Sequence, residues 1–364
     1  MPDTRVKVEV DGNALSDDDL RSLTEIQVEE ATRIADAATL VAALQADSSG
    51  EWRSVLDPLL TPFTPVVVQV SRGDVTYRFE GASTEARWTI APEGSSLLSI
   101  TAVDHTLDLD NEEKIAAWPG SSDSTIAETI FSTYGYDAEV ETTPDSPDPD
   151  VHVVLQRGSD LAFLRALAEK WGYEMYLEAS DIRVTGHFHP VDPLAEPQGE
   201  LALGFGADAQ NVAASVQLLE GHRVKVSRIP ALSDSSQDAE SAGDDQAQGS
   251  SSLADQAVVL LTPGDVAGEV DPSSTAQGLA RRSAFAMRLN VEIDADRVDL
   301  MLRARRPVLV RGLGNALSGR YMVDSVRHVV TLDRHRQHVS LLRNALGLNG
   351  DEPFGVTAGI GLPS

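Results

Sequence analysis

The 364-residue sequence contains no cysteine, which excludes disulfide scaffolds, thiol catalysis and metal sites built on cysteine. Aromatic residues make up only 5% of the chain, too few for a surface that stacks sugars or single-stranded nucleic acid. Positive charge is also scarce, because 57 acidic residues face 29 lysines and arginines and the formal net charge is −28. We therefore expect no nucleic-acid partner and no direct membrane binding, since both kinds of surface carry negative charge.

Long hydrophobic runs and common catalytic motifs are also missing. No segment reaches the roughly 18 apolar residues that span a bilayer, and the polar N-terminus has no signal-peptide core. The sequence therefore predicts synthesis in the cytoplasm without a signal peptide. The phosphate-binding patterns GxxxxGK[ST] and GxGxxG and the nucleophile pattern GxSxG do not occur. We expect no enzymatic activity, no catalytic residue, no bound metal and no cofactor.

Two weaker patterns keep other classes of function open. His187 and His189 alternate along a predicted strand and could both face one metal ion, although no third ligand follows nearby. Asp104 begins an acidic cluster that lacks the glycine an EF-hand loop needs at its sixth position. The alternatives are a β-rich cell-wall hydrolase that acts through acidic residues, or a calcium- or carbohydrate-binding adhesin module. A hydrolase should place carboxyl groups with raised pKa values together in a cleft.

The order of predicted elements divides the chain into parts. Short strands separated by glycine turns fill the first hundred residues and the last sixty before the tail, a pattern typical of β-barrels or β-sandwiches. Two amphipathic helices, at 123–134 and 160–171, lie between them with a few strands. The fold class is predicted to be α+β and mainly β, with a first β-barrel at 1–118, a small α+β unit at 119–190, a second β-barrel at 191–345 and a glycine-rich tail at 346–364.

The helix at 160–171 has the clearest local pattern. Ser159 can accept a hydrogen bond at its N-terminus, and Gly172 suits the left-handed residue that ends a helix. Phe163, Leu164 and Leu167 lie on or beside its apolar stripe, and we expect them to be buried.

Two later segments also receive predictions. Residues 233–256 are mostly serine, aspartate, glutamine, alanine and glycine, so we expect an acidic low-complexity loop at the surface. The pattern that follows predicts a third helix at 275–289.

Two motifs carry a resemblance to a known family. One is QRGSDLAFLRALAEKWGYEMY from Gln156 to Tyr176, and the other is Gly319-Arg320-Tyr321-Met322-Val323 with His328, followed by Arg343. They resemble the phage late control protein D and VgrG-type tail hub family over about residues 5–345. The residues that match the family pattern are Gln156, Ser159, Asp160, Phe163, Leu164, Leu167, Gly172, Tyr173, Gly319, Tyr321, Val323, His328 and Arg343.

The resemblance implies a structural baseplate hub of a contractile phage-tail-like injection system. It implies a homotrimer whose ring joins the hexameric inner tube to the trimeric spike. The implied partners are a spike protein, inner tube or tube-initiator proteins and other baseplate proteins, within a phage-tail-like particle. Because no spike domain follows residue 345, the resemblance predicts a separate hub rather than a fused one.

The tail after residue 345 combines glycines with spaced apolar side chains. We expect these side chains to dock into a groove of the spike or of a neighbouring subunit, since a solvated tail does not need them. A frayed terminus is the other interpretation. The predicted partner-binding residues are Leu348, Phe354, Val356, Ile360 and Leu362.

Overall fold

The computed structural model describes residues 4–73, 75–91, 95–143, 153–203, 209–228, 235–253, 257–261, 272–298, 300–352 and 354. The strands are β1 Arg5–Val10, β2 Asn13–Ala14, β3 Leu23–Ala31, β4 Ala37–Ala43, β5 Gln45–Ala46, β6 Trp52–Arg53, β7 Pro65–Arg72, β8 Val75–Thr89, β9 Leu97–Asp104, β10 Lys114–Pro119, β11 Asp137–Val140, β12 Val153–Gly158, β13 Tyr173–Ala179, β14 Val184–Pro190, β15 Glu200–Ala202, β16 Ala209–Val216, β17 His222–Arg228, β18 Gln237–Ser241, β19 Ser251–Ser252, β20 Ala257–Leu261, β21 Met287–Asp294, β22 Pro307–Arg311, β23 Gly319–Val330, β24 His335–Arg343 and β25 Ala345–Leu346. The helices are α1 Asp17–Ser22, α2 Thr106–Asp110, α3 Asp123–Thr133, α4 Asp160–Trp171, α5 Pro272–Ser283 and α6 Gly314–Leu317, with a 3-10 helix η1 at Asp57–Leu60.

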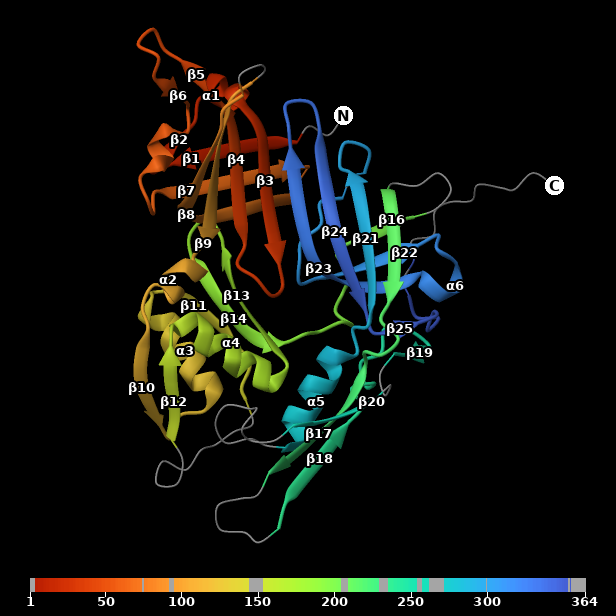
Figure 1. The fold of residues 1–364 in the computed structure, drawn as a ribbon. Coiled ribbons are helices and arrows are strands. Elements are labelled where there is room, and N and C mark those ends of the chain that lie inside the picture. The colour runs from red at the N-terminus through yellow and green to blue at the C-terminus, as the bar shows by residue number, and fades with distance from the viewer. Residues whose placement is uncertain are drawn as a thin grey trace, which may run out of the picture.

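One sheet of 13 strands runs through both ends of the chain (Figure 1). Its main path is β16-β21-β24-β23-β3-β4-β9-β8-β7-β1-β2; β22 also pairs with β23, and β15 pairs with β22. The two halves meet where β3 and β23 pair antiparallel, with Glu30 opposite Val326. The predicted α+β class, mainly β, is confirmed.

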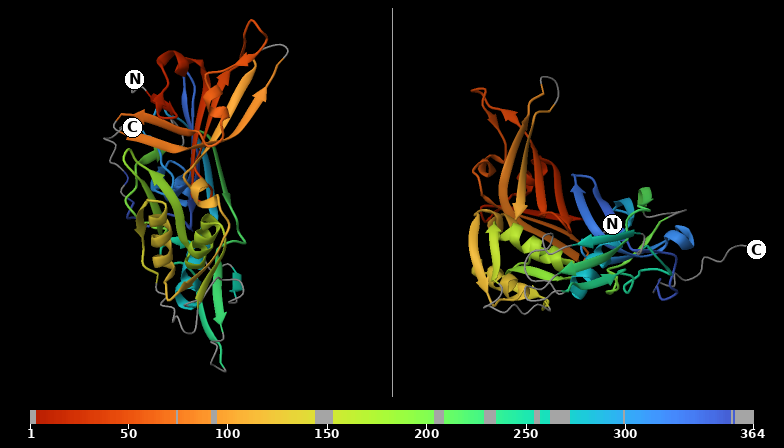
Figure 2. Two further views of the ribbon diagram at one scale, coloured as in Figure 1. Left: turned by 90° about the vertical axis from the view of Figure 1, so that its left-hand side faces the viewer. Right: turned by 60° about the horizontal axis from the view of Figure 1, so that its bottom comes forward.

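The prediction of two closed β-barrels is not met, because no closed barrel forms in the parts of the chain that the structure describes. A strand has two edges, and a barrel closes only when the first and last strands of a sheet pair with each other. Here β3 and β23 use their outer edges to pair across the two halves instead. Figure 2 shows the consequence: the N-terminal strands stand above the α+β unit while the C-terminal strands continue to one side.

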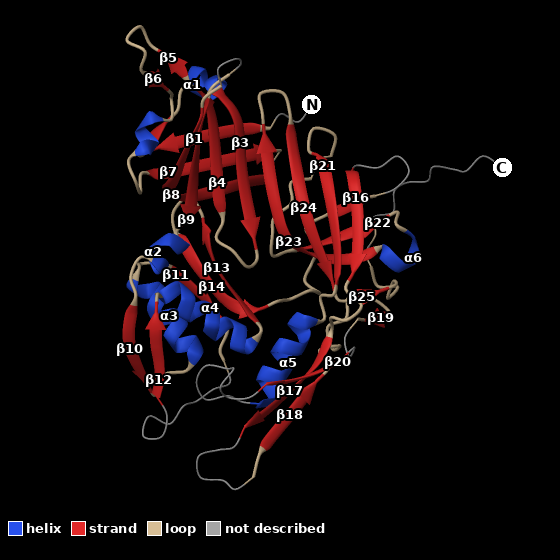
Figure 3. Cartoon of the chain, in the orientation of Figure 1, coloured by secondary structure: helices blue, strands red, loops and turns tan. Residues whose placement is uncertain are grey.

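Four groups of buried apolar side chains hold the elements together. The first lies among β1, β3, β4, β7, β8 and β9, and the second lies among β21 to β24. The third packs α3 and α4 against β12, β13 and β14, and it includes Leu109 of α2. The fourth is small and joins α5 to β17, with Val226 and Ala280 as members. Figure 3 shows that α2, α3, α4 and α5 lie in the lower half of the molecule, away from most of the large sheet.

The helix α4 forms as its sequence predicts. Ser159 caps it by accepting a hydrogen bond from the backbone N–H of Ala162, and Gly172 ends it in the left-handed conformation. Leu164 and Leu167 are fully buried and Phe163 is 6% exposed, which confirms the expected burial of all three.

The predicted helix at 275–289 is wrong in its second half, because α5 ends at Ser283 and β21 begins at Met287. Met287, Leu289, Val291 and Ile293 are all buried while the residues between them are not. This alternation has the period of a strand, and it outweighs the helical pattern of the preceding residues.

The prediction of a loop at 233–256 is wrong for two short strands, while the other described residues, 235–236, 242–250 and 253, lie outside helices and strands. Gln237–Ser241 forms β18 on β17, and Ser251–Ser252 pairs with β25. Gln248 is 1% exposed, and its backbone N–H donates to the side chain of Asn344. Backbone and amide hydrogen bonds order this segment where apolar burial could not. Residues 233, 234 and 254–256 lie outside the described residues.

Among the helices that the structure describes, none is long and apolar enough to cross a membrane.

Candidate functional site

The first motif builds a hydrogen-bonded cluster at the start of α4. The carboxylate of Asp160 accepts bonds from Gln156 at 2.6 Å, from the ammonium of Lys114 at 2.6 Å and from the hydroxyl of Tyr134 at 2.7 Å. The side-chain oxygen of Gln156 in turn accepts from the indole of Trp118 at 3.2 Å. Burial alone would raise the pKa of Asp160, but these bonds outweigh it and hold that pKa below its ordinary value. The cluster therefore joins β10, β12, α3 and α4.

A second buried pair holds α3 to α4 and was not anticipated from the sequence. The ammonium of Lys170 lies 2.6 Å from the carboxylate of Asp123, and both side chains are at most 1% exposed. The indole of Trp171 donates to the same carboxylate at 2.7 Å. Only the unusual lysine on the apolar side of a helix could have indicated it.

Gly172 has a role beyond ending α4. A side chain at this position would lie 2.3 Å from the carbonyl oxygen of Gly278 in α5. A side chain at Gly278 would lie 1.9 Å from the carbonyl oxygen of Trp171. Two glycines therefore allow the end of α4 to touch α5 backbone to backbone. Tyr173, which follows, packs edge-on against Phe188 and faces the cavity described below.

The second motif surrounds a buried arginine. Arg343 is fully buried and donates to three carbonyl oxygens: Ser318 at 2.7 Å, Gln248 at 3.0 Å and Gly347 at 2.6 Å. Its guanidinium lies over the ring of Tyr321 at 5.3 Å. A side chain at Gly319 would lie 2.3 Å from that guanidinium, so glycine is required there.

The histidine of the second motif is part of the core between the two halves. The ring of His328 is fully buried, stacks on Tyr77 and shares a hydrogen bond of 3.1 Å with His335. Burial, aided by the charge of Arg303, lowers the pKa of His328 to about 4. Val323, the last residue of the motif, is also fully buried. The motif residues described above thus lie in separate contacts within the protein and do not converge on one reactive centre.

A network of arginines connects all three parts of the chain. Arg303 binds Glu30 of β3 at 2.6 Å and Glu178 of β13 at 2.8 Å. Arg305 binds Asp36, next to β4, at 2.6 Å and lies over the ring of Tyr176 at 4.3 Å. Sequence reasoning missed this network, and the dense arginines at 303–306 were the available signal.

The same network holds a carboxyl group with an unusual pKa. Burial raises the pKa of Asp36 to about 7, although the charge of Arg305 opposes the rise. Asp36 also receives the backbone N–H of Ala31 at 3.1 Å, so its oxygens are engaged within the protein.

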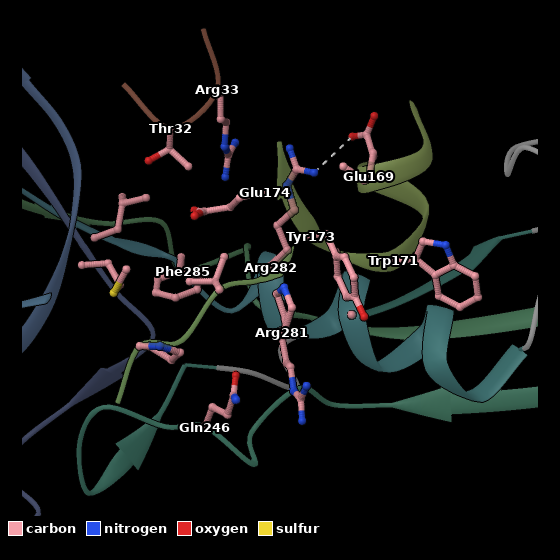
Figure 4. A pocket seen from close by; sticks show the side chains of 18 of the residues that line it. Thr32, Arg33, Glu169, Trp171, Tyr173, Glu174, Gln246, Arg281, Arg282 and Phe285 are labelled. Atoms are coloured by element: carbon pink, nitrogen blue, oxygen red, sulfur yellow. Dashed lines mark ion pairs between the residues drawn. The ribbon is translucent and has the colours of Figure 1, made fainter. Parts of the chain in front are cut away.

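A cavity of about 420 Å³ lies where the three parts meet. Its walls come from the turn between β3 and β4, from α4, β13 and α5, and from Met322, Val323 and Asp324 of β23. Figure 4 shows Arg33, Glu174, Tyr173, Arg282 and Phe285 around it. Burial raises the pKa of Glu174 to about 7.

The alternatives from the sequence gain no support from this geometry. No group of three or more metal-ligating side chains occurs within the residues described, and His187 instead stacks on Tyr176 at 4.4 Å. In the cavity, Glu174 is accompanied by Glu169 and Asp324, which are ion-paired to Arg282 and Arg288. The raised carboxyl therefore has no second unpaired carboxyl beside it among the lining residues.

The ribbon of β10 and β12 presents apolar side chains to solvent. Ile115 is 90% exposed, Leu155 is 58% exposed and Val153 is 36% exposed. The pairing places Ala117 opposite Leu155 and Pro119 opposite Val153, on the same outer face. Arg157 lies opposite Ile115 on this face, and the other residues are apolar. A mainly apolar exposed face of this kind is typical of protein contact surfaces.

Of the predicted partner-binding residues, Leu348 and Phe354 are described, and both are half-buried. Val356, Ile360 and Leu362 lie outside the described residues.

The family model of the Alg8 N-terminal domain matches residues 3–331. The chain belongs to the Alg8 N-terminal domain family. No curated protein sequence matches this member of the family.

Solved structures share the fold of this Alg8 N-terminal domain protein. The tail protein of Neisseria meningitidis MC58 matches with a TM-score of 0.62 and 12% identity, covering 94% of this chain and 97% of that one. The 43 kDa tail protein of prophage MuSo2 from Shewanella oneidensis matches with a TM-score of 0.61 and 13% identity, covering 94% and 100%. The similarity to phage tail proteins indicated by the motifs is thereby confirmed at the level of fold.

A third solved structure with a similar fold is that of a secretion-system component. The E. coli c3393 protein is a component of the type VI secretion system with structural similarity to the T4 bacteriophage tail proteins gp27 and gp5. It matches with a TM-score of 0.56 and 10% identity, covering 94% of this chain and 76% of that one.

Proposed function

We propose that the chain is the structural baseplate hub of a contractile phage-tail-like injection system. The observation that carries this proposal is the fold, which extends over 94% of this chain and almost all of two phage tail proteins. A local similarity could arise from one shared supersecondary unit, but a match over both halves and the α+β unit between them cannot.

In the proposed assembly, three copies form a ring that joins a hexameric inner tube to a trimeric spike. The apolar face of β10 and β12 supports association, because a monomer leaves Ile115 and Leu155 in water. The two ends of the large sheet, at β16 and β2, are edges on which further strands can pair. The partners are copies of this chain, a spike protein, inner tube or tube-initiator proteins and other baseplate proteins.

The proposed role is structural rather than catalytic, within a phage-tail-like particle. The motif residues support this, since Arg343, Asp160 and His328 are engaged in buried contacts within the protein. The half-buried Leu348 and Phe354 belong to the tail that we propose as a spike contact.

Coexpression with a spike protein and an inner tube protein of the same system tests the proposal. We expect both to copurify with the chain, and electron microscopy of the complex to show threefold rings. A double variant, Ile115→Ser with Leu155→Ser, should weaken ring formation, while Leu332→Ser, which changes another exposed leucine, should not. Capture of neither partner, with only monomers on the grid, would contradict the proposal.

A further inference from the structure

The cavity between the three parts of the chain is not explained by the hub function. Its volume of about 420 Å³ is within the range of small-molecule sites. The side chains of Tyr173, Phe285 and Met322 supply an apolar part of the wall. Arg33, Glu174 and Arg282 also line the cavity, and Figure 4 draws their side chains in the upper part of the view.

Several charged side chains that line the cavity already form ion pairs within the protein. Arg281 binds Asp245, Arg282 lies 3.8 Å from Glu169, and Asp324 lies 2.9 Å from Arg288.

By contrast, the side chains of Arg33 and Glu174 form no ion pair or hydrogen bond among the residues that the structure describes. Arg33 is also near enough to Arg282 that its charge contributes to lowering the pKa of Arg282, after the larger effect of burial. Arg33 and Arg282 thus both bring a guanidinium group to the cavity, and guanidinium groups bind carboxylates through charge-assisted, often bidentate hydrogen bonds.

Glu174 determines which anion fits. Its side chain is 9% exposed and extends into the cavity. Burial raises its pKa to about 7; the nearby charges of Arg305, Arg282 and Arg33 lower it, and that of Asp324 raises it. Below pH 7 Glu174 is therefore protonated, and a protonated carboxyl can donate a hydrogen bond to an anionic oxygen.

We propose that this cavity binds a carboxylate that carries an apolar group, with Arg33 and Arg282 holding the carboxylate and Phe285 and Tyr173 contacting the apolar part. Glu174 donates its proton to the bound carboxylate as a hydrogen bond. The proposal concerns a ligand site and does not depend on the role as a hub. The same chemistry is found at the C-terminal end of a peptide with an apolar last residue and in a free apolar acid.

Isothermal titration calorimetry at pH 6 with three probes tests the proposal. The probes are N-acetyl-leucyl-phenylalanine, its C-terminal amide and 4-phenylbutyrate. We expect saturable binding of the peptide acid, and binding of the amide at least about tenfold weaker, because the ion pairs are lost. Tighter binding of the peptide acid than of 4-phenylbutyrate assigns the site to a chain end, and the reverse assigns it to a free acid.

Two variants identify the groups that act. Arg33→Gln should weaken binding of the peptide acid about tenfold, while Arg53→Gln, an exposed arginine outside the cavity, should leave it unchanged. Between pH 6 and pH 8 the wild type should lose about tenfold in affinity as Glu174 ionises, while Glu174→Gln should not. Equal binding of acid and amide, no saturable binding at 10 mM, or an Arg33→Gln variant with unchanged affinity would each overturn the proposal.

Discussion

Arg343 illustrates how a single residue of the second motif acts on the fold. Three backbone carbonyl groups from separate segments depend on its guanidinium. Arg343→Met keeps the apolar stem but leaves these buried acceptors without a donor, so we expect it to lower the free energy of unfolding by about 3 kcal/mol. Urea unfolding followed by circular dichroism measures the loss.

Arg336→Met is the matched control on the same strand. Arg336 is 40% exposed and pairs with Glu292, so its loss should lower the free energy of unfolding by less than about 1 kcal/mol. Equal losses in the two variants would show that the three carbonyl groups do not depend on Arg343.

Glu174 predicts how stability depends on pH. Its folded pKa of about 7 lies above its ordinary value of 4.5, so between these values the unfolded chain releases a proton that the folded chain keeps. Stability from this group is complete below pH 4.5 and falls as the pH rises to 7. Glu174→Gln should therefore gain stability relative to the wild type across that window, as thermal unfolding at pH 4, 5, 6, 7 and 8 would reveal. A constant difference between the two proteins would show that the carboxyl titrates normally.

At this scale the sequence identified the motif residues but not their partners. Ser159, Gly172 and Leu164 were predictable because caps, stops and apolar stripes depend on neighbours along the chain. The pairs Lys170–Asp123 and Arg305–Asp36 join residues 47 and 269 positions apart. The pattern of neighbouring residues in the sequence does not indicate contacts over such separations.

Among the elements, α4 is the centre of the α+β unit. Leu164 is fully buried in its core, so Leu164→Ala should lower the free energy of unfolding by about 2–5 kcal/mol. Leu155→Ala removes the same atoms from a side chain that is 58% exposed and should cost less than about 0.5 kcal/mol. Similar losses for both variants in urea unfolding would contradict the packing described.

The contact between α4 and α5 requires glycine because a side chain has no room there. Comparison with Gly135, at the end of α3, separates this steric effect from the effect of the left-handed backbone. Gly172 and Gly135 both follow helices and have φ of 67° and 75°, but only Gly172 has atoms within 4 Å of a side chain built there. Gly135→Ala should cost about 1–2 kcal/mol from the left-handed backbone alone. Gly172→Ala should cost at least about 1 kcal/mol more, and thermal unfolding of the two variants compares them directly.

Strands whose pairing is distant were harder to predict than helices. The buried alternation from Met287 to Ile293 follows directly on α5, and its first residues also suit a helical period. β18 contains no large apolar residue, and it exists because β17 offers backbone groups to pair with. A strand of that kind is determined by its neighbour and not by its own composition.

For the whole molecule, the sequence predicted the class and the similarity to phage tail proteins but not the single sheet. Whether the two β-rich halves close separately or pair with each other depends on the pairing of β3 with β23. That pairing places Glu30 opposite Val326, almost 300 positions away in the sequence. Each half has the alternation of a sheet with one buried face, and this pattern is the same in both arrangements.

The measurement that tests the central claim most directly is the native mass of the purified chain at several protein concentrations and at two ionic strengths. A net charge of −28 on each copy opposes association, and salt screens that repulsion. The account predicts a species of three times the mass of one chain, more abundant at 0.5 M than at 0.05 M sodium chloride. A chain that remains monomeric at high concentration in both salts would contradict it.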